Sequence, residues 1–355
     1  MGTRRFTDED IQLDSLYDDL ADLDLQPLWR LSGTLTDEPV PRTQPYRWRA
    51  RQLRELGERA GRLVPIDRGG DRRVLSCANP GLGGAPHATS TLWAGLQYLG
   101  GHEYAPAHRH TPAALRFVFE GSGVWTLVDG DPIHMSRGDL VLTPSWTFHE
   151  HHNTTADPML WLDVLDVPVV SYLESIFYED GPSEDVDRRT AVRSTAEQRW
   201  ALGSGLKPVA RDLPGPGADH SPLLVYRWSD TDEALRALAG QVERDVRLRF
   251  TDPVRGTDVM PTMRCEMQRV PAGRTTTPHR QTGSRVGAVL NGTGTLVIAG
   301  REFDVQPGDV FAVPSWSWLT LASGTAEDLD VFTVSDAPIV EAVRLYREEW
   351  QEEQR

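Results

Sequence analysis

Residues 107–153 read AHRHTPAALRFVFEGSGVWTLVDGDPIHMSRGDLVLTPSWTFHEHHN, and residues 278–324 read PHRQTGSRVGAVLNGTGTLVIAGREFDVQPGDVFAVPSWSWLTLASG. The second stretch repeats the first, and the aligned pairs are His108 with His279, Gly121 with Gly292, Gly138 with Gly308, and Pro144 with Pro314. Short apolar runs separated by Gly, Pro, Asn and Asp are typical of strands joined by turns. Two copies of one strand-rich unit predict an all-β fold with flanking helices, built from two tandem jelly-roll barrels.

Local patterns add a turn and two helices to this fold. Asp129-Gly130 stands between two alternating runs and predicts a hairpin turn. Apolar residues at helical spacing predict a helix over residues 13–20 and another over residues 339–350. With 355 residues the chain is long enough for two domains. We place them at residues 1–195 and 196–355, with a Gly-, Pro- and Asp-rich connection between about 179 and 221.

The composition is that of a globular protein. A net charge of -15 argues against nucleic acid, whose phosphates require a basic face. No apolar run is long enough to span a membrane, and the first residues do not form a secretory signal. Two cysteines, Cys77 and Cys265, are too few for a disulfide framework and favour a cytoplasmic location.

Seven of the ten histidines lie between His102 and His152. Alternation along a strand turns His108 and His110 to the same face, and a second strand can bring His149 beside them. Three neutral nitrogen ligands on one face of a cation leave positions open, as non-haem iron enzymes require. An isolated His-x-His is weak evidence, but its spacing to Gly138, Pro144 and His149 favours a metal site.

These paired segments resemble the cupin superfamily, and within it the gentisate and salicylate 1,2-dioxygenases. The similarity covers nearly the whole chain and includes the segments LYDDLADLDLQPLW, DRRVLSCANPG, TLWAGLQYLG, WLDVLDVPVV, DVMPTMRCEM and SDAPIVEA. Many cupins carry a glutamate ligand four residues after the second histidine, whereas Ala114 stands there in this chain. The resemblance therefore implies a site of three histidines and no carboxylate.

The resemblance also implies a reaction. One Fe(II) per chain would support cleavage of gentisate by dioxygen between the carboxyl-bearing and hydroxyl-bearing carbons, giving maleylpyruvate and requiring no other cofactor. Salicylate, 5-substituted salicylates and 1-hydroxy-2-naphthoate are alternative substrates for the same chemistry. The family further implies a homotetramer that acts in the catabolism of aromatic compounds. A bicupin that binds a ligand without catalysis is a more remote alternative.

Several residues are candidates for binding the substrate. Arg116 follows His110 by six residues, an even separation that puts it on the same strand face if the strand is regular. Its planar guanidinium suits a carboxylate. The resemblance adds Arg68, Arg72, Trp93, Gly95 and Gln97. In so arginine-rich a chain a solvated surface charge is the competing interpretation, and it is strongest for Arg68.

His151 lies two residues past His149, on the same predicted face, and is a candidate for acid–base catalysis. His152 should point the other way and serve a structural role. Asp163 matches a position that lines the substrate pocket in the family, and Trp161 should share its face. In the second repeat Gln281 and Leu319 replace two of the three histidines, so we expect no metal there.

Overall fold

The computed structural model describes residues 8–33, 35–69, 73–181, 193–201, 219–239, 241 and 244–351. The chain divides into two compact units, Met1–Val40 and Pro41–Arg355. The first unit contains α1 (Asp8–Asp22) and η1 (Leu28–Arg30), so the expected N-terminal helix is confirmed. All the remaining elements belong to the second unit, which carries the candidate site.

The first barrel is formed by two antiparallel sheets. A six-stranded sheet has the order β12-β8-β5-β10-β3-β2, and a five-stranded sheet has the order β11-β4-β9-β6-β7. The strands are β2 (Val74–Ser76), β3 (Trp93–Leu99), β4 (Tyr104–His110), β5 (Ala114–Glu120), β6 (Ser122–Val128), β7 (Asp131–Ser136), β8 (Leu140–Thr143), β9 (His149–Asn153), β10 (Met159–Leu165), β11 (Tyr178–Asp180) and β12 (Val225–Tyr226).

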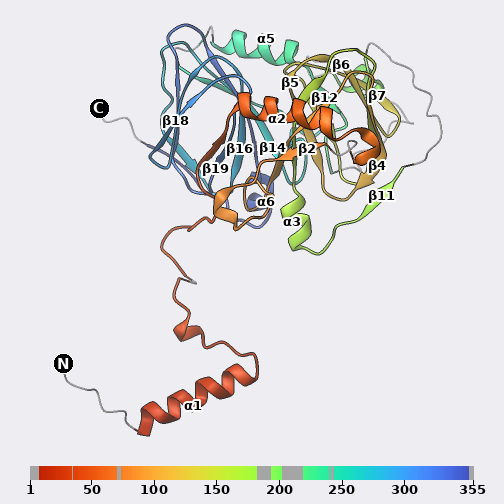
Figure 1. The fold of residues 1–355 in the computed structure, drawn as a ribbon. Coiled ribbons are helices and arrows are strands. Elements are labelled where there is room, and N and C mark those ends of the chain that lie inside the picture. Colours follow the sequence, from red (N-terminus) through yellow and green to blue (C-terminus); the bar gives the residue numbers. More distant parts are fainter. Residues whose placement is uncertain are drawn as a thin grey trace. The chain divides into compact units, whose positions relative to one another are not determined.

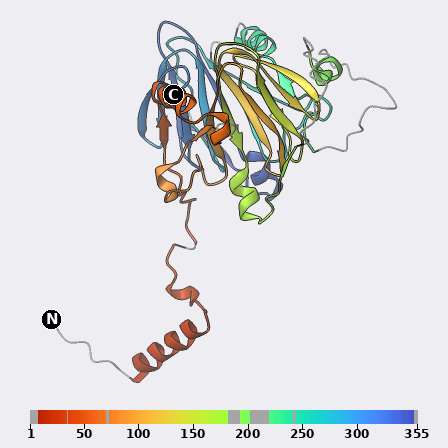
Figure 2. The same ribbon diagram turned by 45° about the vertical axis from the view of Figure 1, so that its right-hand side comes forward.

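The second barrel has the same plan, and the two lie beside each other in Figures 1 and 2. Its sheets have the orders β1-β19-β16-β21-β14-β13 and β18-β17-β20-β15-β22. The strands are β1 (Tyr46–Trp48), β13 (Val246–Arg249), β14 (Arg264–Val270), β15 (His279–Gln281), β16 (Arg285–Asn291), β17 (Gly294–Ile298), β18 (Arg301–Val305), β19 (Val310–Val313), β20 (Leu319–Ser323), β21 (Leu329–Ser335) and β22 (Glu348–Trp350). The two-barrel fold expected from the repeat is confirmed.

The predicted hairpin turn between β6 and β7 is also confirmed. Asp129 and Gly130 have φ angles of 46° and 80°, so both lie in the left-handed region that a tight two-residue hairpin requires. Ala299 and Gly300 repeat this geometry between β17 and β18, with φ angles of 48° and 77°. The repeat in sequence is therefore also a repeat in backbone conformation.

Each barrel receives one strand from the other half of the chain. β1, near the start, pairs with β19 of the second barrel, and β12 pairs with β8 of the first. A helix follows each exchanged strand: α2 (Ala50–Leu63) after β1 and α5 (Trp228–Ala239) after β12. The expected division between residues 195 and 196 stays a prediction. β1 and β12 each join the barrel formed mainly by residues on the other side of it.

The residues that we expected to connect the barrels contain regular structure. β11 pairs with β4, and α4 (Thr195–Trp200) begins with a capping box in which Ser194 and Glu197 each bond to the other's backbone. Residues 182–192 and 202–218 lie outside the described part of the chain.

The expected C-terminal helix is wrong for most of its length. α6 spans Ala337–Ala342, Arg344 has a φ of 60°, and Glu348–Trp350 form β22, which pairs with β15. The first barrel has the same arrangement, in which α3 (Val167–Tyr172) is followed by β11. Pairing with a sheet edge overrides the helical spacing of the apolar residues because each strand residue gains a backbone partner.

The largest apolar cluster lies between the barrels. It joins the outward-facing residues of the two six-stranded sheets, and Phe117 stacks on Phe332 with ring centroids 4.1 Å apart. Smaller clusters fill each barrel, around Trp161 in the first and Phe311 in the second. This packing turns the opposite face of β5 and β10 toward the interior of the first barrel. None of the helices described is long and apolar enough to cross a membrane.

Candidate metal centre

Two neighbouring strands bring three histidines together inside the first barrel. His108 on β4 is paired in register with His149 on β9, and His110 lies two residues farther along β4. One ring nitrogen from each of the three lies within 4.8 Å of the others. The His108 ring centroid is 4.3 Å from that of His149 and 5.6 Å from that of His110. The expected grouping is therefore present.

A carbonyl oxygen fixes one nitrogen of each ring. The Nδ1 atoms of His108, His110 and His149 lie 3.0, 2.7 and 3.0 Å from the backbone oxygens of Pro106, Pro112 and Thr147. Because a carbonyl only accepts, each Nδ1 carries the hydrogen and each Nε2 is left as the ligand atom. Histidines that bind metals are oriented in this way.

Burial favours the neutral form of two of the three imidazoles, those of His110 and His149. It lowers the pKa of His110 to about 4, with smaller contributions from the charges of His108 and Arg116. It also lowers the pKa of His149 well below its ordinary value, and the charge of Arg116 acts in the same direction. A metal binds the unprotonated ring, so the donor set fits a cation such as Fe(II).

Arg116 reaches the interior from the opposite sheet. The expectation that His110 and Arg116 share one strand is wrong, because β4 ends at His110 and β5 begins at Ala114. The Arg116 side chain is nevertheless buried, and its charge lowers the pKa values of His110, His149 and His151. Arg116 thus lies near the histidines because the chain turns from one sheet to the other after His110, and not because the two residues alternate along one strand.

Two neighbours hold the Arg116 guanidinium. Asp163 on β10 is paired in register with Arg116, and its Oδ1 lies 3.3 Å from Arg116 Nε. Arg116 Nη1 donates a hydrogen bond to Thr143 Oγ1, and Trp161 Nε1 donates to Asp163 Oδ1 over 3.1 Å. Burial lowers the pKa of Arg116 and raises that of Asp163 to about 6. Sequence reasoning missed Thr143, whose signal was a lone hydroxyl at the end of an apolar strand.

β3 continues the same interior face. Gly95 pairs with Asp163 and Gln97 with Trp161, so Trp93, Gly95 and Gln97 turn to the side on which Arg116 lies. A Cβ at Gly95 would lie 2.6 Å from Val74 and 2.7 Å from the Trp93 ring, so a larger residue would displace this wall. Trp93 Nε1 donates to Ser76 Oγ over 3.2 Å.

The structure does not bring every candidate to the interior. Arg68 ends the short helix η2 (Ile66–Arg68) and is exposed, as expected for a surface charge. Arg72 lies outside the described residues.

His151 and His152 point in opposite directions from β9, as the alternation predicts. His151 is buried in the interior, 5.4 Å from Trp161 and 6.2 Å from His149 between ring centroids. Its Nδ1 lies 2.7 Å from Thr126 Oγ1. On the outer face, the His152 ring stacks on Trp125 at 4.5 Å and on Tyr104 at 5.9 Å.

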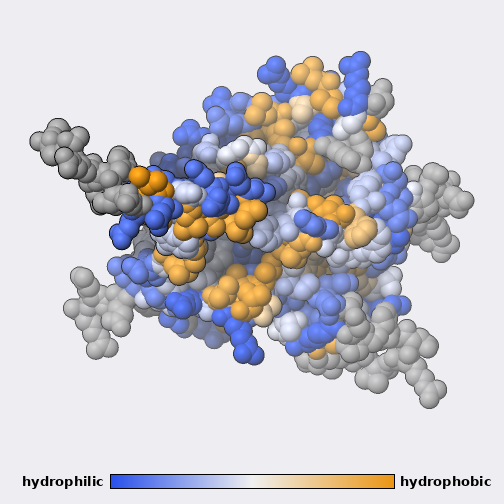
Figure 3. Space-filling model, turned by 90° about the horizontal axis from the view of Figure 1, so that it is seen from below, coloured by the Kyte–Doolittle hydropathy of each residue, from blue (hydrophilic) through white to orange (hydrophobic). Residues whose placement is uncertain are grey.

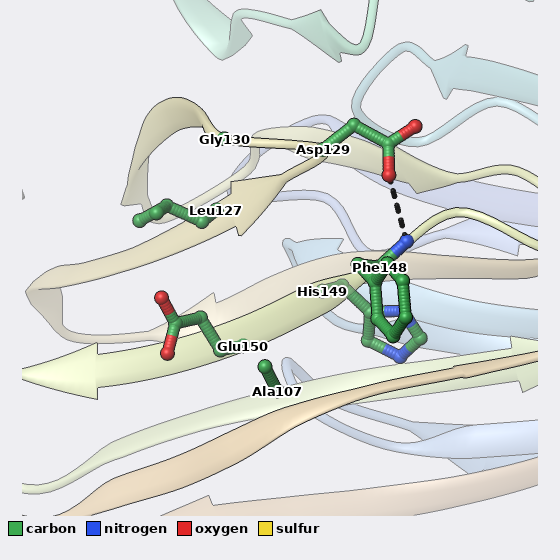
Figure 4. A pocket seen from close by; sticks show the side chains of 7 residues that line it. All are labelled: Ala107, Leu127, Asp129, Gly130, Phe148, His149 and Glu150. Carbon is green, nitrogen blue, oxygen red and sulfur yellow. Dashed lines mark hydrogen bonds between the residues drawn. The ribbon is translucent and has the colours of Figure 1, made fainter. Parts of the chain in front are cut away.

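A separate apolar pocket of about 310 Å³ lies against the outer side of β9. Figure 4 shows its lining, including Leu127, Glu150 and Ala107, and the bond from the Phe148 amide to Asp129. Glu150 and His149 are consecutive strand residues and therefore point to opposite faces. His149 nevertheless also lines the pocket, so the pocket borders one member of the three-histidine group.

The second barrel holds a single imidazole, bonded to a carboxylate and a guanidinium, where the first holds three imidazoles. His279 Nε2 lies 2.7 Å from Glu348 Oε1, and Arg285 Nη1 lies 3.3 Å from His279 Nδ1. Arg285 is the counterpart of Ala114, at the position where many cupins carry a glutamate ligand. One imidazole whose two ring nitrogens already bond to Glu348 and Arg285 is a poor metal site, because neither nitrogen is left as a ligand.

Known proteins share this architecture. A model of the cupin domain matches residues 95–165 and 266–335, one segment in each barrel. A gentisate 1,2-dioxygenase from Streptomyces sp is 45% identical over 345 residues, which cover 94% of each chain.

The chain belongs to the gentisate and salicylate 1,2-dioxygenase family.

Other members of this family differ in the substrate that they are named for. A 5-aminosalicylate 1,2-dioxygenase from Comamonas sp is 35% identical and covers 95% of this chain and 90% of its own. The salicylate 1,2-dioxygenase of Pseudaminobacter salicylatoxidans has a solved structure with a TM-score of 0.90 and 41% identity, covering 98% of this chain and 99% of that one. A structure of that enzyme's adducts with gentisate gives a TM-score of 0.91 at 40% identity, covering 99% of this chain and 96% of that one.

Proposed function

We propose that the first barrel binds one Fe(II) per chain through His108, His110 and His149 and uses it to cleave gentisate with dioxygen. The observation that carries this proposal is the group of three imidazoles beside one buried guanidinium, Arg116. A set of histidines that leaves positions open suits non-haem Fe(II) and its oxygen chemistry. The family's named members are ring-cleaving dioxygenases, which supports the same conclusion.

Bound iron supplies a Lewis acid and a template that brings the aromatic acid next to dioxygen. Arg116 binds the substrate carboxylate, because its planar fork matches two carboxylate oxygens. Asp163 pairs with the Nε atom of this guanidinium, and Thr143 accepts a hydrogen bond from its Nη1 atom, so both contacts orient it. The ring opens between the carboxyl-bearing and hydroxyl-bearing carbons, and both oxygen atoms enter the product, maleylpyruvate. The reaction balances without a reductant.

His151 is the proposed acid–base group. Burial lowers its pKa well below the ordinary value, and the charge of Arg116 adds to this effect. A neutral imidazole in the interior can accept the proton of a substrate hydroxyl and return it to the ring-opened product.

Oxygen uptake tests the proposal directly. The protein is loaded anaerobically with Fe(II) and mixed with a panel of hydroxybenzoates, and absorbance follows the ring-opened product. Uptake with gentisate supports the proposal. No uptake with any member of the panel would instead favour a bicupin that binds its ligand without catalysis.

Salicylate and its 5-substituted relatives are second candidates, as is 1-hydroxy-2-naphthoate. The interior face of β3 and β10 carries the apolar wall of Trp93, Gly95 and Trp161 beside the polar Gln97 and Asp163. Such a wall does not strongly reject a ligand that lacks one hydroxyl. We expect turnover of gentisate and weaker activity on salicylates. A higher kcat/KM for salicylate would reverse this order without changing the iron site.

We further propose that the protein is a cytoplasmic homotetramer that acts in the catabolism of aromatic acids. Exposed apolar side chains after α3 and α6 support assembly, and they are Leu173, Ile176, Phe177, Val343 and Leu345. Figure 3 looks at the side on which these helices lie in Figure 1, and apolar patches alternate there with hydrophilic ones. Both cysteines are free and buried, which fits a reducing compartment. Light scattering should give four times the 39.6 kDa chain mass.

A further inference from the structure

A buried threonine controls one nitrogen of His151. Thr126 on β6 is paired in register with His151 on β9 and has no exposed surface. Thr126 Oγ1 lies 2.7 Å from His151 Nδ1 and 3.4 Å from Met135 Sδ on β7. For His151 Nε2, the described residues provide no hydrogen-bond partner. The ring is therefore anchored through Nδ1 alone, and Nε2 is left for the contents of the barrel.

The second barrel lacks this trio. Leu296 and Leu321 occupy the positions of Thr126 and His151 and are paired in the same register. Val305 occupies the position of Met135 at the end of the next strand. The three residues are thus polar or sulfur-containing only in the barrel that also holds the three-histidine group. A packing role alone does not require this difference, since leucine and valine fill the same place in the other repeat.

A count of hydrogens decides how the trio is arranged. The Thr126 hydroxyl has a single hydrogen, which goes either to His151 Nδ1 or to Met135 Sδ. If it goes to Nδ1, the thioether gains no donor. If it goes to the thioether, Oγ1 accepts the hydrogen of Nδ1, and both contacts become hydrogen bonds. The second arrangement satisfies one more acceptor in a site closed to water.

We propose that Met135 and Thr126 together hold His151 as the tautomer with hydrogen on Nδ1, so that Nε2 presents a lone pair to the substrate. Thr126 is then a positioning residue that makes His151 a proton acceptor rather than a donor. The catalytic role of His151 in this inference rests on the proposed function. The position of the hydrogen on the His151 ring does not depend on that function.

Nuclear magnetic resonance tests the tautomer without any turnover. The full chain is labelled with ¹⁵N-histidine and loaded with diamagnetic Zn(II), and long-range ¹H–¹⁵N correlations show which ring nitrogen carries hydrogen. The His151 signals are those lost in a His151→Asn variant. We expect hydrogen on Nδ1 in the parent protein and a mixture of both tautomers in Met135→Leu, where donating to Nδ1 and accepting from it each make a single hydrogen bond. Hydrogen on Nε2 in the parent, or an unchanged tautomer in Met135→Leu, would overturn the proposal.

Kinetics test the consequence. Thr126→Val keeps the shape but loses the hydroxyl, and kcat should fall roughly tenfold to a hundredfold with iron content and KM little changed. Thr126→Ser restores the hydroxyl and should recover most of the loss. A serine variant as slow as the valine variant would show a packing role only. If the parent oxidises no hydroxybenzoate, the proposed function fails, whereas the resonance result still decides the tautomer.

Discussion

At the scale of single residues, Arg116 is the buried cation that the proposed substrate carboxylate requires. Arg116→Ala removes a charge-assisted hydrogen bond of about 1.5–3 kcal/mol, so kcat/KM for gentisate should fall roughly tenfold to a hundredfold. Arg116→Lys keeps the charge but not the planar fork and should recover only part of the loss. Steady-state kinetics at matched iron content measure both variants. Unchanged kinetics in the alanine variant would exclude Arg116 from substrate binding.

Asp163 gives the site a pH dependence. Burial raises its pKa to about 6, so the carboxyl takes up a proton as the pH falls through that value. It then loses the charge that pairs with Arg116, and kcat/KM should decrease on the acid side. Asp163→Asn is uncharged at every pH and should lack this limb in a profile from about pH 5 to pH 8. An acid limb that persists in the asparagine variant would assign it to another group.

The three proposed ligands act as one unit. Replacing His108, His110 or His149 by alanine leaves two imidazoles, and each variant should lose iron and turnover together. Metal analysis after dialysis gives the iron content, and oxygen uptake gives the turnover. A variant that retains full iron content would remove that residue from the ligand set.

At the scale of elements, an aspartate of each barrel accepts a hydrogen bond from the start of the helix that follows the exchanged strand. Asp139 accepts from the Trp228 amide over 3.0 Å and from Arg227 Nη1 over 2.7 Å, while Asp309 accepts from the Ala50 amide over 2.7 Å. Asp139→Ala should cost about 1–3 kcal/mol, because buried donors lose their acceptor. Thermal unfolding should show a lower Tm with iron content retained. Asp157→Ala, at an exposed position, is the control, and an equal effect of the two variants would contradict the account.

The elements also show where local pattern is sufficient and where it fails. The hairpin at Asp129-Gly130 is predictable because the two residues tolerate the left-handed backbone that the turn needs. Glu348–Trp350 could not be placed, because their strand depends on β15, far away in the sequence. The same reason explains why the exchange of β1 was missed. Arg116 was assigned to the interior correctly, but by way of a continuous strand that does not exist.

At the scale of the whole molecule, the two barrels share a fold but not a donor set. We expect about one iron per chain, because the second barrel offers a single histidine that is paired with Glu348 and Arg285. His279→Ala is the matched control for His108→Ala and should leave both iron content and turnover unchanged. Two irons per chain, or loss of iron in the His279 variant, would contradict this division.

The repeat predicted the paired barrels because each copy carries its own glycines, prolines and alternating strands. The repeat also predicted that only the first barrel has a metal site, because Gln281 and Leu319 replace two of its three histidines in the second copy. The large apolar cluster between the barrels was not predictable, because Phe117 and Phe332 alternate with interior residues like any strand residue. Which face of a sheet meets a second sheet is decided by the assembled fold.

The proposed reaction in the first barrel inserts both atoms of dioxygen into gentisate. Turnover under ¹⁸O₂ with the Fe(II)-loaded protein, followed by mass spectrometry of the ring-opened acid, tests it most directly. We expect a product that carries two ¹⁸O atoms, with one dioxygen consumed for each gentisate, when borohydride in the quench reduces the new ketone before its oxygen exchanges with water. Under these conditions a product with one labelled oxygen, or an intact ring, would contradict dioxygen insertion.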